Sequence, residues 1–258
     1  ELELFANVRP AKIYRGVHTR FEGVDIVVIR ENLEDLYSGL EYGKGGFTDK
    51  SKGVRSDAAV SLKVISEKNS KQISSFAFEY ALNNKRKKVT AVHKANILKY
   101  TDGLFLDIAR RTARKYPKIE FEDRIVDNMT MQLVQKPELY DVLVCPNLYG
   151  DILSDLCSGL VGGLGIAPSM NVGKKYAVFE PVHGSAPKYT GMNKVNPTST
   201  ILAGVLMLRH LGKTKEADSL ESAVASVISE RKYVTYDVNK KKNVGTKEMA
   251  NAVISKLS

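Results

Sequence analysis

Apolar and polar positions repeat with two different periods along most of this chain, and the two periods take turns. β-Branched or continuous apolar runs predict buried strands at 23–30, 88–93, 119–126, 140–145 and 176–180. Apolar positions three and four residues apart predict helices at 70–83, 102–116, 127–134, 151–160, 198–211, 215–230 and 246–257. Strands that alternate with helices predict an α/β fold with a mostly parallel sheet.

Four polar residues fall at or just after the ends of predicted strands: Arg30, Lys94, Asp127 and Asn147. In open α/β sheets, ligand-binding groups collect at the carboxyl ends of the strands. We therefore expect these side chains to contribute to a single site.

Asp151 and Asp155 lie four residues apart in a predicted helix, so both carboxylates point from one face. Two like charges there favour a hard divalent cation such as Mg²⁺, although an exposed acidic face or an N-terminal capping pair is an alternative. The glycine-rich run 159–165, with Pro168 after it, must end the helix and lets the backbone pass close to another group.

Candidate substrate-binding and acid–base groups lie outside this helix. Arg9 and Arg30 carry planar guanidinium groups suited to carboxylates, although either alone is more often part of a surface ion pair. Tyr37 and Lys94 can act as acid and base if the lysine is desolvated; otherwise they are a turn aromatic and a solvated loop lysine. His183 contacts a ligand or merely caps a turn. Together these groups indicate metal-assisted chemistry on an acidic small molecule.

Composition and charge narrow the classes of partner. The hydrophobic fraction is 43% and the charged fraction 26%, as in ordinary globular proteins, and no apolar run approaches the length of a membrane span. The net charge is +10, but the basic runs 85–88 and 240–242 have no interleaved aromatic residues, so we expect no nucleic-acid partner. Cys145 and Cys157 are predicted to be small core residues, which fits the cytoplasm or, in a eukaryote, the mitochondrial matrix.

Short motifs in a fixed order are similar to those of the β-decarboxylating dehydrogenases, the isocitrate and isopropylmalate dehydrogenase family. The Asn-Leu-x-Gly-Asp-x-x-Ser-Asp segment within 147–155 is the most specific of them. The matching segments are 7–10, 29–32, 34–37, 92–96, 126–127, 147–155, 162–168, 183–189 and 196–197. The resemblance extends over essentially the whole chain.

The resemblance implies an isopropylmalate-dehydrogenase-like two-domain fold. Residues 1–162 would form the small substrate and dimerisation domain, in which a clasp at about 35–66 reaches the second subunit. Residues 163–258 would form the C-terminal part of the large, nucleotide-binding domain. Members of the family also carry an upstream segment with a Ser-x-Asn-x-x-Leu-Arg motif, which this sequence does not contain, so we expect it to be either a fragment of a longer chain or a truncated polypeptide.

The resemblance also implies that a 2-hydroxy acid is oxidised by hydride transfer to a nicotinamide and then loses its β-carboxylate. The implied substrate-binding residues are Arg9, Arg30, Tyr37, Lys94 and Asn96. Tyr37 would protonate the enolate and Lys94 would assist removal of the hydroxyl proton. Mg²⁺ or Mn²⁺ would be held by Asp151, Asp155 and Asp127. Because Lys94 and Asp127 would come from the partner subunit, the resemblance implies a homodimer with shared sites.

The stretch 30–37 resembles the isocitrate branch, whereas the isopropylmalate branch has a glycine-rich turn after its arginine. We therefore expect a tricarboxylate substrate, isocitrate. Homoisocitrate dehydrogenase, 3-isopropylmalate dehydrogenase and a non-catalytic regulatory subunit of an NAD-dependent isocitrate dehydrogenase remain alternatives. The implied cofactor-binding residues are His183, Gly184, Ser185, Ala186, Lys188, Tyr189, Asn196, Tyr236 and Lys240. Lys188 stands where NAD-type members usually carry an acidic residue, so we expect NADP rather than NAD.

Overall fold

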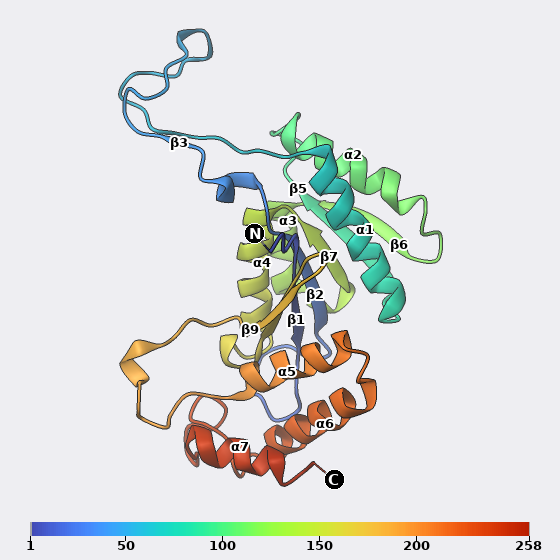
Figure 1. Ribbon diagram of the computed structural model, residues 1–258, viewed down its shortest axis with the longest axis vertical. Coiled ribbons are helices and arrows are strands. Elements are labelled where there is room, and N and C mark those ends of the chain that lie inside the picture. The colour runs from blue at the N-terminus through green and yellow to red at the C-terminus, as the bar shows by residue number, and fades with distance from the viewer. Residues whose placement is uncertain (1, 258) are drawn as a thin grey trace.

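A seven-stranded sheet in the order β6-β5-β7-β2-β1-β8-β9 runs through the computed structural model, which describes residues 2–257 (Figure 1). Its strands are β1 (Ala6–Lys12), β2 (Asp25–Glu31), β5 (Lys88–His93), β6 (Glu120–Ile125), β7 (Val142–Cys145), β8 (Pro168–Val172) and β9 (Ala177–Pro181). Five of them lie where the apolar runs predict strands. The predicted α/β class is confirmed.

The sheet has a parallel part and an antiparallel part. Strands β6, β5, β7 and β2 are parallel neighbours, as the alternation of strands and helices predicts. Strands β1, β8 and β9 add antiparallel pairs at the other side, and the sequence pattern predicts neither β1 nor β8. Both contain proline and polar residues, and they form because each is paired on both sides.

Helices cover both faces of the parallel part. The helices are α1 (Glu67–Asn83), α2 (Thr101–Ala113), α3 (Val126–Gln135), α4 (Asn147–Leu160), α5 (Thr198–His210), α6 (Thr214–Glu230) and α7 (Thr246–Ile254). In β2, Val27 and Ile29 face the core under α1 and α2, whereas Ile26 and Val28 face the core under α3 and α4. Because alternate residues of β2 face opposite sides of the sheet and both sides are buried, the strand appears in the sequence as one continuous apolar run.

The last three helices form a layer around their own core. Helix α5 packs on β8 and β9, and α6 and α7 close a cluster that contains Val224, Ile228 and Met249. The sheet thus continues on both sides of the domain boundary predicted near Gly163, because β8 and β9 lie beyond it and β8 pairs with β1.

Helix α4 begins four residues earlier than predicted. The sequence predicts a loop at 146–150 and a helix from Asp151, whereas the helix begins at Asn147 directly after Pro146. Proline and glycine in this stretch suggest a loop, but tertiary contacts of Asn147 and Gly150 stabilise a helical turn there. The predicted end of the helix is confirmed: Gly162 and Gly163 have φ angles of 118° and 108°, which glycine adopts without strain.

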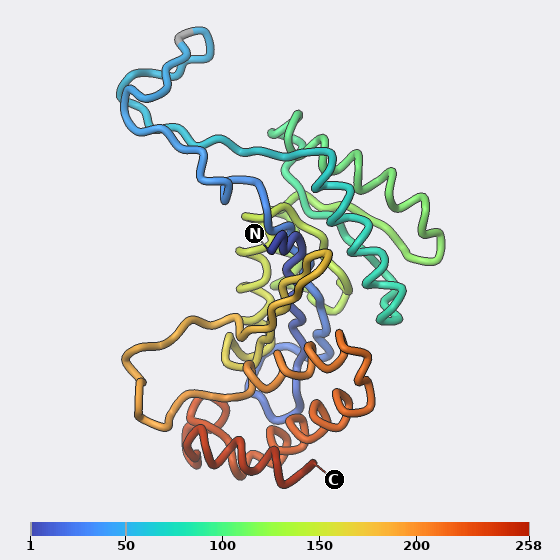
Figure 2. Tube along the Cα trace, in the orientation of Figure 1, coloured from blue at the N-terminus to red at the C-terminus, as the bar shows by residue number. Residues whose placement is uncertain are grey.

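A long arm leaves the body between β2 and α1 (Figures 1 and 2). It contains the two-residue strands β3 (Glu41–Tyr42) and β4 (Val60–Ser61), which pair antiparallel. Large apolar side chains near its base are exposed, among them Leu36, Leu40 and Tyr42. Most residues of 42–60 are exposed, which agrees with the many Gly, Lys and Ser residues of this segment. No helix among residues 2–257 combines the length and the apolarity needed to cross a lipid bilayer.

Candidate active site

The candidate site begins where β2 passes the first turn of α4. A Cβ on Gly150 would lie 2.6 Å from both Cβ and Cγ of Arg30, so only glycine lets the helix approach this strand so closely. Arg30 Nε donates to Asn147 Oδ1 at 2.8 Å, and Asn147 Nδ2 donates to the Glu34 carbonyl at 3.0 Å. The guanidinium of Arg30 also forms an ion pair with Asp151. Arg30 is therefore fixed at its base and directed at the first carboxylate of the predicted pair.

Arg9 reaches the same helix from β1. Its Nη1 lies 3.5 Å from Asp151 Oδ1 and 3.3 Å from Asp155 Oδ1, and it donates to Ser154 Oγ at 2.7 Å. Burial, and then the charge of the neighbouring Arg30, lower the pKa of Arg9, and its buried Nε meets no hydrogen-bond acceptor among the described residues. Two guanidinium groups side by side, one of them with an unused donor, form a site suited to an anion.

Tyr37 lies over these groups on a short 3-10 helix, η1 (Asp35–Ser38). Its hydroxyl donates to Asp151 Oδ2 at 2.6 Å, and the guanidinium carbon of Arg30 lies 4.7 Å from its ring centroid. The hydrogen bond to Asp151, and next the partial burial, raise the pKa of Tyr37, so the phenol keeps its proton near neutral pH. A protonated phenol above two arginines can donate a proton to a bound anion.

The predicted carboxylate pair fits a hard cation. Asp151 and Asp155 both direct an oxygen towards one nitrogen of Arg9, so they converge on a common position, and carboxylate oxygens are the ligands that Mg²⁺ and Mn²⁺ prefer. The described residues contain no group of three or more His, Cys, Asp or Glu arranged to hold a metal ion. One chain alone thus offers two convergent carboxylates.

Lys94 and Asp127 form a separate pair. They follow β5 and β6, and the ammonium group of Lys94 forms an ion pair with the Asp127 carboxylate, whose exposed side chain has its pKa lowered by this hydrogen bond. Asn96 is exposed in the turn after Lys94. Among the described residues, no side-chain contact joins Lys94 or Asp127 to Asp151 or Asp155, so a site shared with α4 stays a prediction for this pair. Arg30 and Asn147 do meet, as predicted.

A hollow of about 420 Å³ lies beside the glycine-rich end of α4. Six of the predicted cofactor-binding residues line it: His183, Gly184, Ala186, Tyr189, Asn196 and Tyr236. Asn196 uses both ends of its amide, since it donates to Asp237 Oδ2 at 2.8 Å and accepts from the Thr198 N–H at 3.0 Å, and it thereby fixes the start of α5. The buried Nε2 of His183 meets no partner among the described residues.

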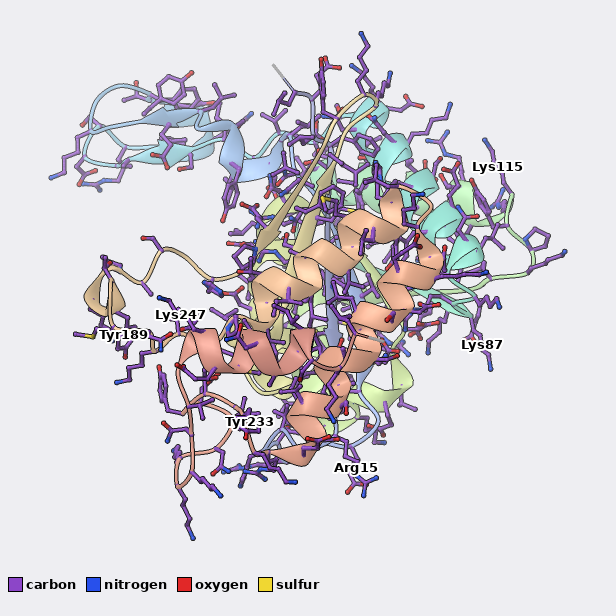
Figure 3. The ribbon with its side chains drawn as sticks, turned by 60° about the horizontal axis from the view of Figure 1, so that its bottom comes forward. Arg15, Lys87, Lys115, Tyr189, Tyr233 and Lys247 are labelled. Carbon is purple, nitrogen blue, oxygen red and sulfur yellow. The ribbon has the colours of Figure 1, made fainter. Side chains whose placement is uncertain are left out.

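Two tyrosines and two lysines gather at the mouth of this hollow. Tyr189 projects from the body on the loop between β9 and α5 (Figure 3), and its ring centroid lies 6.4 Å from that of Tyr236. The Nζ atoms of Lys188 and Lys194 lie 4.9 and 5.0 Å from the Tyr189 centroid, and Lys194 Nζ lies 4.9 Å from the Tyr236 centroid. Contacts with Tyr236 and Lys188 lower the pKa of Tyr189. This cluster of cations and phenols suits a phosphate group.

Two other predicted cofactor-binding residues, Ser185 and Lys240, do not line the hollow. Ser185 is exposed on the same loop as Tyr189, and Lys240 is exposed beyond Tyr236 and is not among the described lining residues. Sequence reasoning missed Lys194 and Ser154, because neither residue type is diagnostic by itself. Lys194 lies two residues before Asn196, a predicted cofactor-binding residue, and this position could have indicated it.

Comparisons with known proteins identify the family of this chain. The family model "Isocitrate/isopropylmalate dehydrogenase" matches residues 1–253. The "Isocitrate dehydrogenase [NAD] catalytic subunit 6, mitochondrial" of Arabidopsis thaliana is 52% identical over 92% of this chain and 61% of its own length. The 3-isopropylmalate dehydrogenase of Archaeoglobus fulgidus is 48% identical over 100% of this chain and 74% of its own length.

A solved structure is similar as well. The crystal structure of isocitrate dehydrogenase from Methylococcus capsulatus has a TM-score of 0.91 and 48% sequence identity, and the match covers 98% of this chain and 73% of that chain. This chain thus spans less than two thirds of the length of the Arabidopsis relative. The matched range, the identity and the shared fold together place the chain in the isocitrate/isopropylmalate dehydrogenase family.

Proposed function

We propose that the protein oxidatively decarboxylates isocitrate to 2-oxoglutarate, with hydride transfer to a nicotinamide dinucleotide. The observation that carries this proposal is the convergence of Arg9, Arg30 and Tyr37 on Asp151, with Asp155 in contact with the same Arg9. Such a site has cations for carboxylate groups, an acid with a proton to give and oxygen ligands for a divalent ion. A tricarboxylate with one hydroxyl group needs all three.

The chain's own residues have distinct roles in the proposed reaction. Arg9 and Arg30 would exchange their contacts with Asp151 for the substrate's carboxylates, and the fixed base of Arg30 orients its guanidinium for a bidentate contact. Lys94 would help to remove the proton from the hydroxyl oxygen while the carbon that bears this oxygen gives its hydride to the nicotinamide. After CO₂ has left, Tyr37 would give its proton to the enolate carbon. Asn96 would add a polar contact to the substrate.

Asp151 and Asp155, with Asp127 of a second subunit, would hold Mg²⁺ or Mn²⁺. The fit rests on the convergence of the two α4 carboxylates and on their oxygen chemistry. When bound, such a cation neutralises negative charge that develops on the substrate. Asp151 and Asp155, once they serve as metal ligands, would no longer neutralise Arg9 and Arg30, and both arginines would be available for substrate.

The same proposal calls for a homodimer with shared sites. Lys94 and Asp127 pair with each other and would complete the site of the partner subunit. The arm, with its exposed apolar side chains, would form the intersubunit clasp at about 35–66. The small domain would then be 1–162, and 163–258 would belong to the nucleotide-binding domain.

We propose NADP as the preferred dinucleotide. The hollow beside α4 would take the adenosine, and the Lys188, Tyr189 and Tyr236 cluster, with Lys240 and Lys194, would surround its 2′-phosphate. No carboxylate among the described residues pairs with Lys188 or Lys194, so both charges remain available. NAD is the alternative, and the name of the Arabidopsis relative favours it.

The test is reduced-nicotinamide absorbance with isocitrate and Mg²⁺, with NADP and with NAD. It should be run on this chain and on any longer natural polypeptide that contains it. Asp151→Asn should abolish metal-dependent turnover and leave the fold intact; undiminished turnover would contradict the proposal. Turnover with homoisocitrate or 3-isopropylmalate alone would change the substrate. No turnover with any of the three, together with retained ligand binding, would indicate a regulatory subunit.

A further inference from the structure

A lysine of the arm is buried in the body. Lys63 follows β4, and only 12% of its side chain is exposed. Its Nζ lies 2.9 Å from Asp102 Oδ1 and 3.3 Å from Asp35 Oδ1, and the side chains of both aspartates are fully buried. Nζ also lies 4.3 Å from the ring centroid of Tyr149. A buried ammonium group that meets two buried carboxylates needs an explanation, because all three charges are costly to desolvate.

Each aspartate uses its second oxygen to hold a backbone N–H of the proposed machinery. Asp102 Oδ2 accepts from the Lys94 N–H at 2.6 Å, and Asp35 Oδ2 accepts from the Leu148 N–H at 2.9 Å in the first turn of α4. The Oδ1 atoms that face Lys63 accept no hydrogen bond from any described residue and meet the ammonium group as ion pairs. The ammonium group is thus the link between two carboxylates that fix two different segments.

Asp35 connects the same cluster to Tyr37. It is the first residue of η1 and has a φ of 73°, a left-handed conformation that costs a non-glycine residue free energy. Its N–H donates to the carbonyl of Val64 at 2.8 Å, next to Lys63, so the returning pass of the arm holds this backbone in place. The returning pass of the arm leads from β4 into α1 (Figure 1). Two residues after Asp35, Tyr37 reaches Asp151.

We propose that Lys63 is a positioning residue that fixes two groups of catalytic residues relative to each other. Through Asp102 it holds the turn of Lys94, and through Asp35 it holds η1 with Tyr37 and the start of α4. The roles of Lys94 and Tyr37 rest on the proposed function, whereas the linkage does not. In the proposed dimer, Lys94 serves the partner's site and Tyr37 its own, so one ammonium group sets the geometry that this chain contributes to both sites.

The first test measures hydrogen exchange of the intact protein. Lys63→Met keeps the length of the side chain and removes the charge. We expect faster exchange at the N–H groups of Lys94 and Leu148, because their acceptors lose the ammonium group that orients them. The matched control is Lys88→Met, since Lys88 Nζ lies 3.3 Å from Glu122 and 5.4 Å from the Tyr140 ring, away from these segments. Unchanged exchange at both amides would overturn the proposal, whether or not the protein has dehydrogenase activity.

The second test separates positioning from stability. Lys63→Met should lower kcat about tenfold to a hundredfold with little change in the KM for the dinucleotide, because misplaced catalytic groups slow the chemical step. Lys63→Arg, which restores the charge, should recover most of kcat. A lowered melting temperature with normal kcat would reduce Lys63 to a structural residue. If Lys63→Met does not fold, Asp102→Asn keeps an acceptor for the Lys94 N–H, and normal exchange and kcat in that variant overturn the proposal. If the wild-type protein shows no turnover, that result refutes the proposed function but not the linkage through Lys63.

Discussion

Replacement of Gly150 by alanine tests the packing that places Arg30. The new methyl group would lie 2.6 Å from Cβ and Cγ of Arg30 and 3.1 Å from its Cα, well inside van der Waals contact. In an open helix the same change stabilises by roughly 0.8–1 kcal/mol through helix propensity. Overpacking against a buried strand costs about 1–3 kcal/mol, so we expect Gly150→Ala to destabilise the protein by roughly 1 kcal/mol.

Gly159 provides a matched control on the same helix. A Cβ there meets no atom within 4 Å, so Gly159→Ala gains the propensity term alone and should stabilise the protein by about 0.5–1 kcal/mol. The two free energies of unfolding, measured with urea, should therefore shift in opposite directions.

Gly150→Ala should also raise the KM for isocitrate about tenfold, because a displaced Arg30 loses about 1.4 kcal/mol of its contact with a carboxylate. Gly159→Ala should leave this KM unchanged. Equal shifts in unfolding free energy for the two variants would refute the packing argument. A normal KM in a destabilised Gly150→Ala protein would refute the role of Arg30.

Three further predictions concern the stability of the protein at acid pH, its preference between NADP and NAD, and the packing of its hydrophobic core. Burial alone raises the pKa of Glu221, but hydrogen bonds from Lys12 and Arg209 outweigh it and leave the pKa below its ordinary value. The contribution of Glu221 to the free energy of unfolding is therefore present above its unfolded pKa and lost as the pH falls through its folded pKa. Glu221→Gln should make the urea midpoint of unfolding depend less steeply on pH over that acid range. An unchanged dependence on pH would contradict the pairing. Lys188→Asp should lower the ratio of kcat/KM for NADP to that for NAD at least tenfold, of which loss of one phosphate contact accounts for about 1.4 kcal/mol, and an unchanged ratio would show that this cation does not select the cofactor. Phe78→Ala should cost about 3–5 kcal/mol of unfolding free energy, because Phe78 is fully buried and stacks on Tyr116 at 5.1 Å, and a loss below 1 kcal/mol would mean that the core collapses into the space.

Most elements of the parallel part could be predicted from the sequence, because their strands are buried on both faces and their helices are amphipathic. β1 and β8 could not, since Pro10 and Asn171 lower their strand propensity and only pairing on both sides stabilises them. The early start of α4 also depends on tertiary contacts, in this case the close approach of Arg30 to Gly150.

The candidate site shows the same division. Residues at strand ends were found from periodicity, and the two α4 carboxylates from their spacing. Arg9, in the middle of β1, contacts Asp155 because of the order of the strands in the sheet. The sequence pattern does not predict this order. Lys63 was missed because a lysine beside a polar surface segment is usually solvated, and only the folded structure buries it.

The pairing of β1 with β8 has a consequence for how the chain folds. Asn7 lies in β1, and its amide donates to Ser169 and Asn171, which are 162 and 164 residues away along the chain. At about 5–20 residues per second of synthesis, β1 waits on the order of ten seconds or more for this partner. Contacts so distant in sequence also slow folding in free solution. Throughout that interval the edge of β1 is open to other strands, so this edge is where a chaperone has most to protect in the nascent chain.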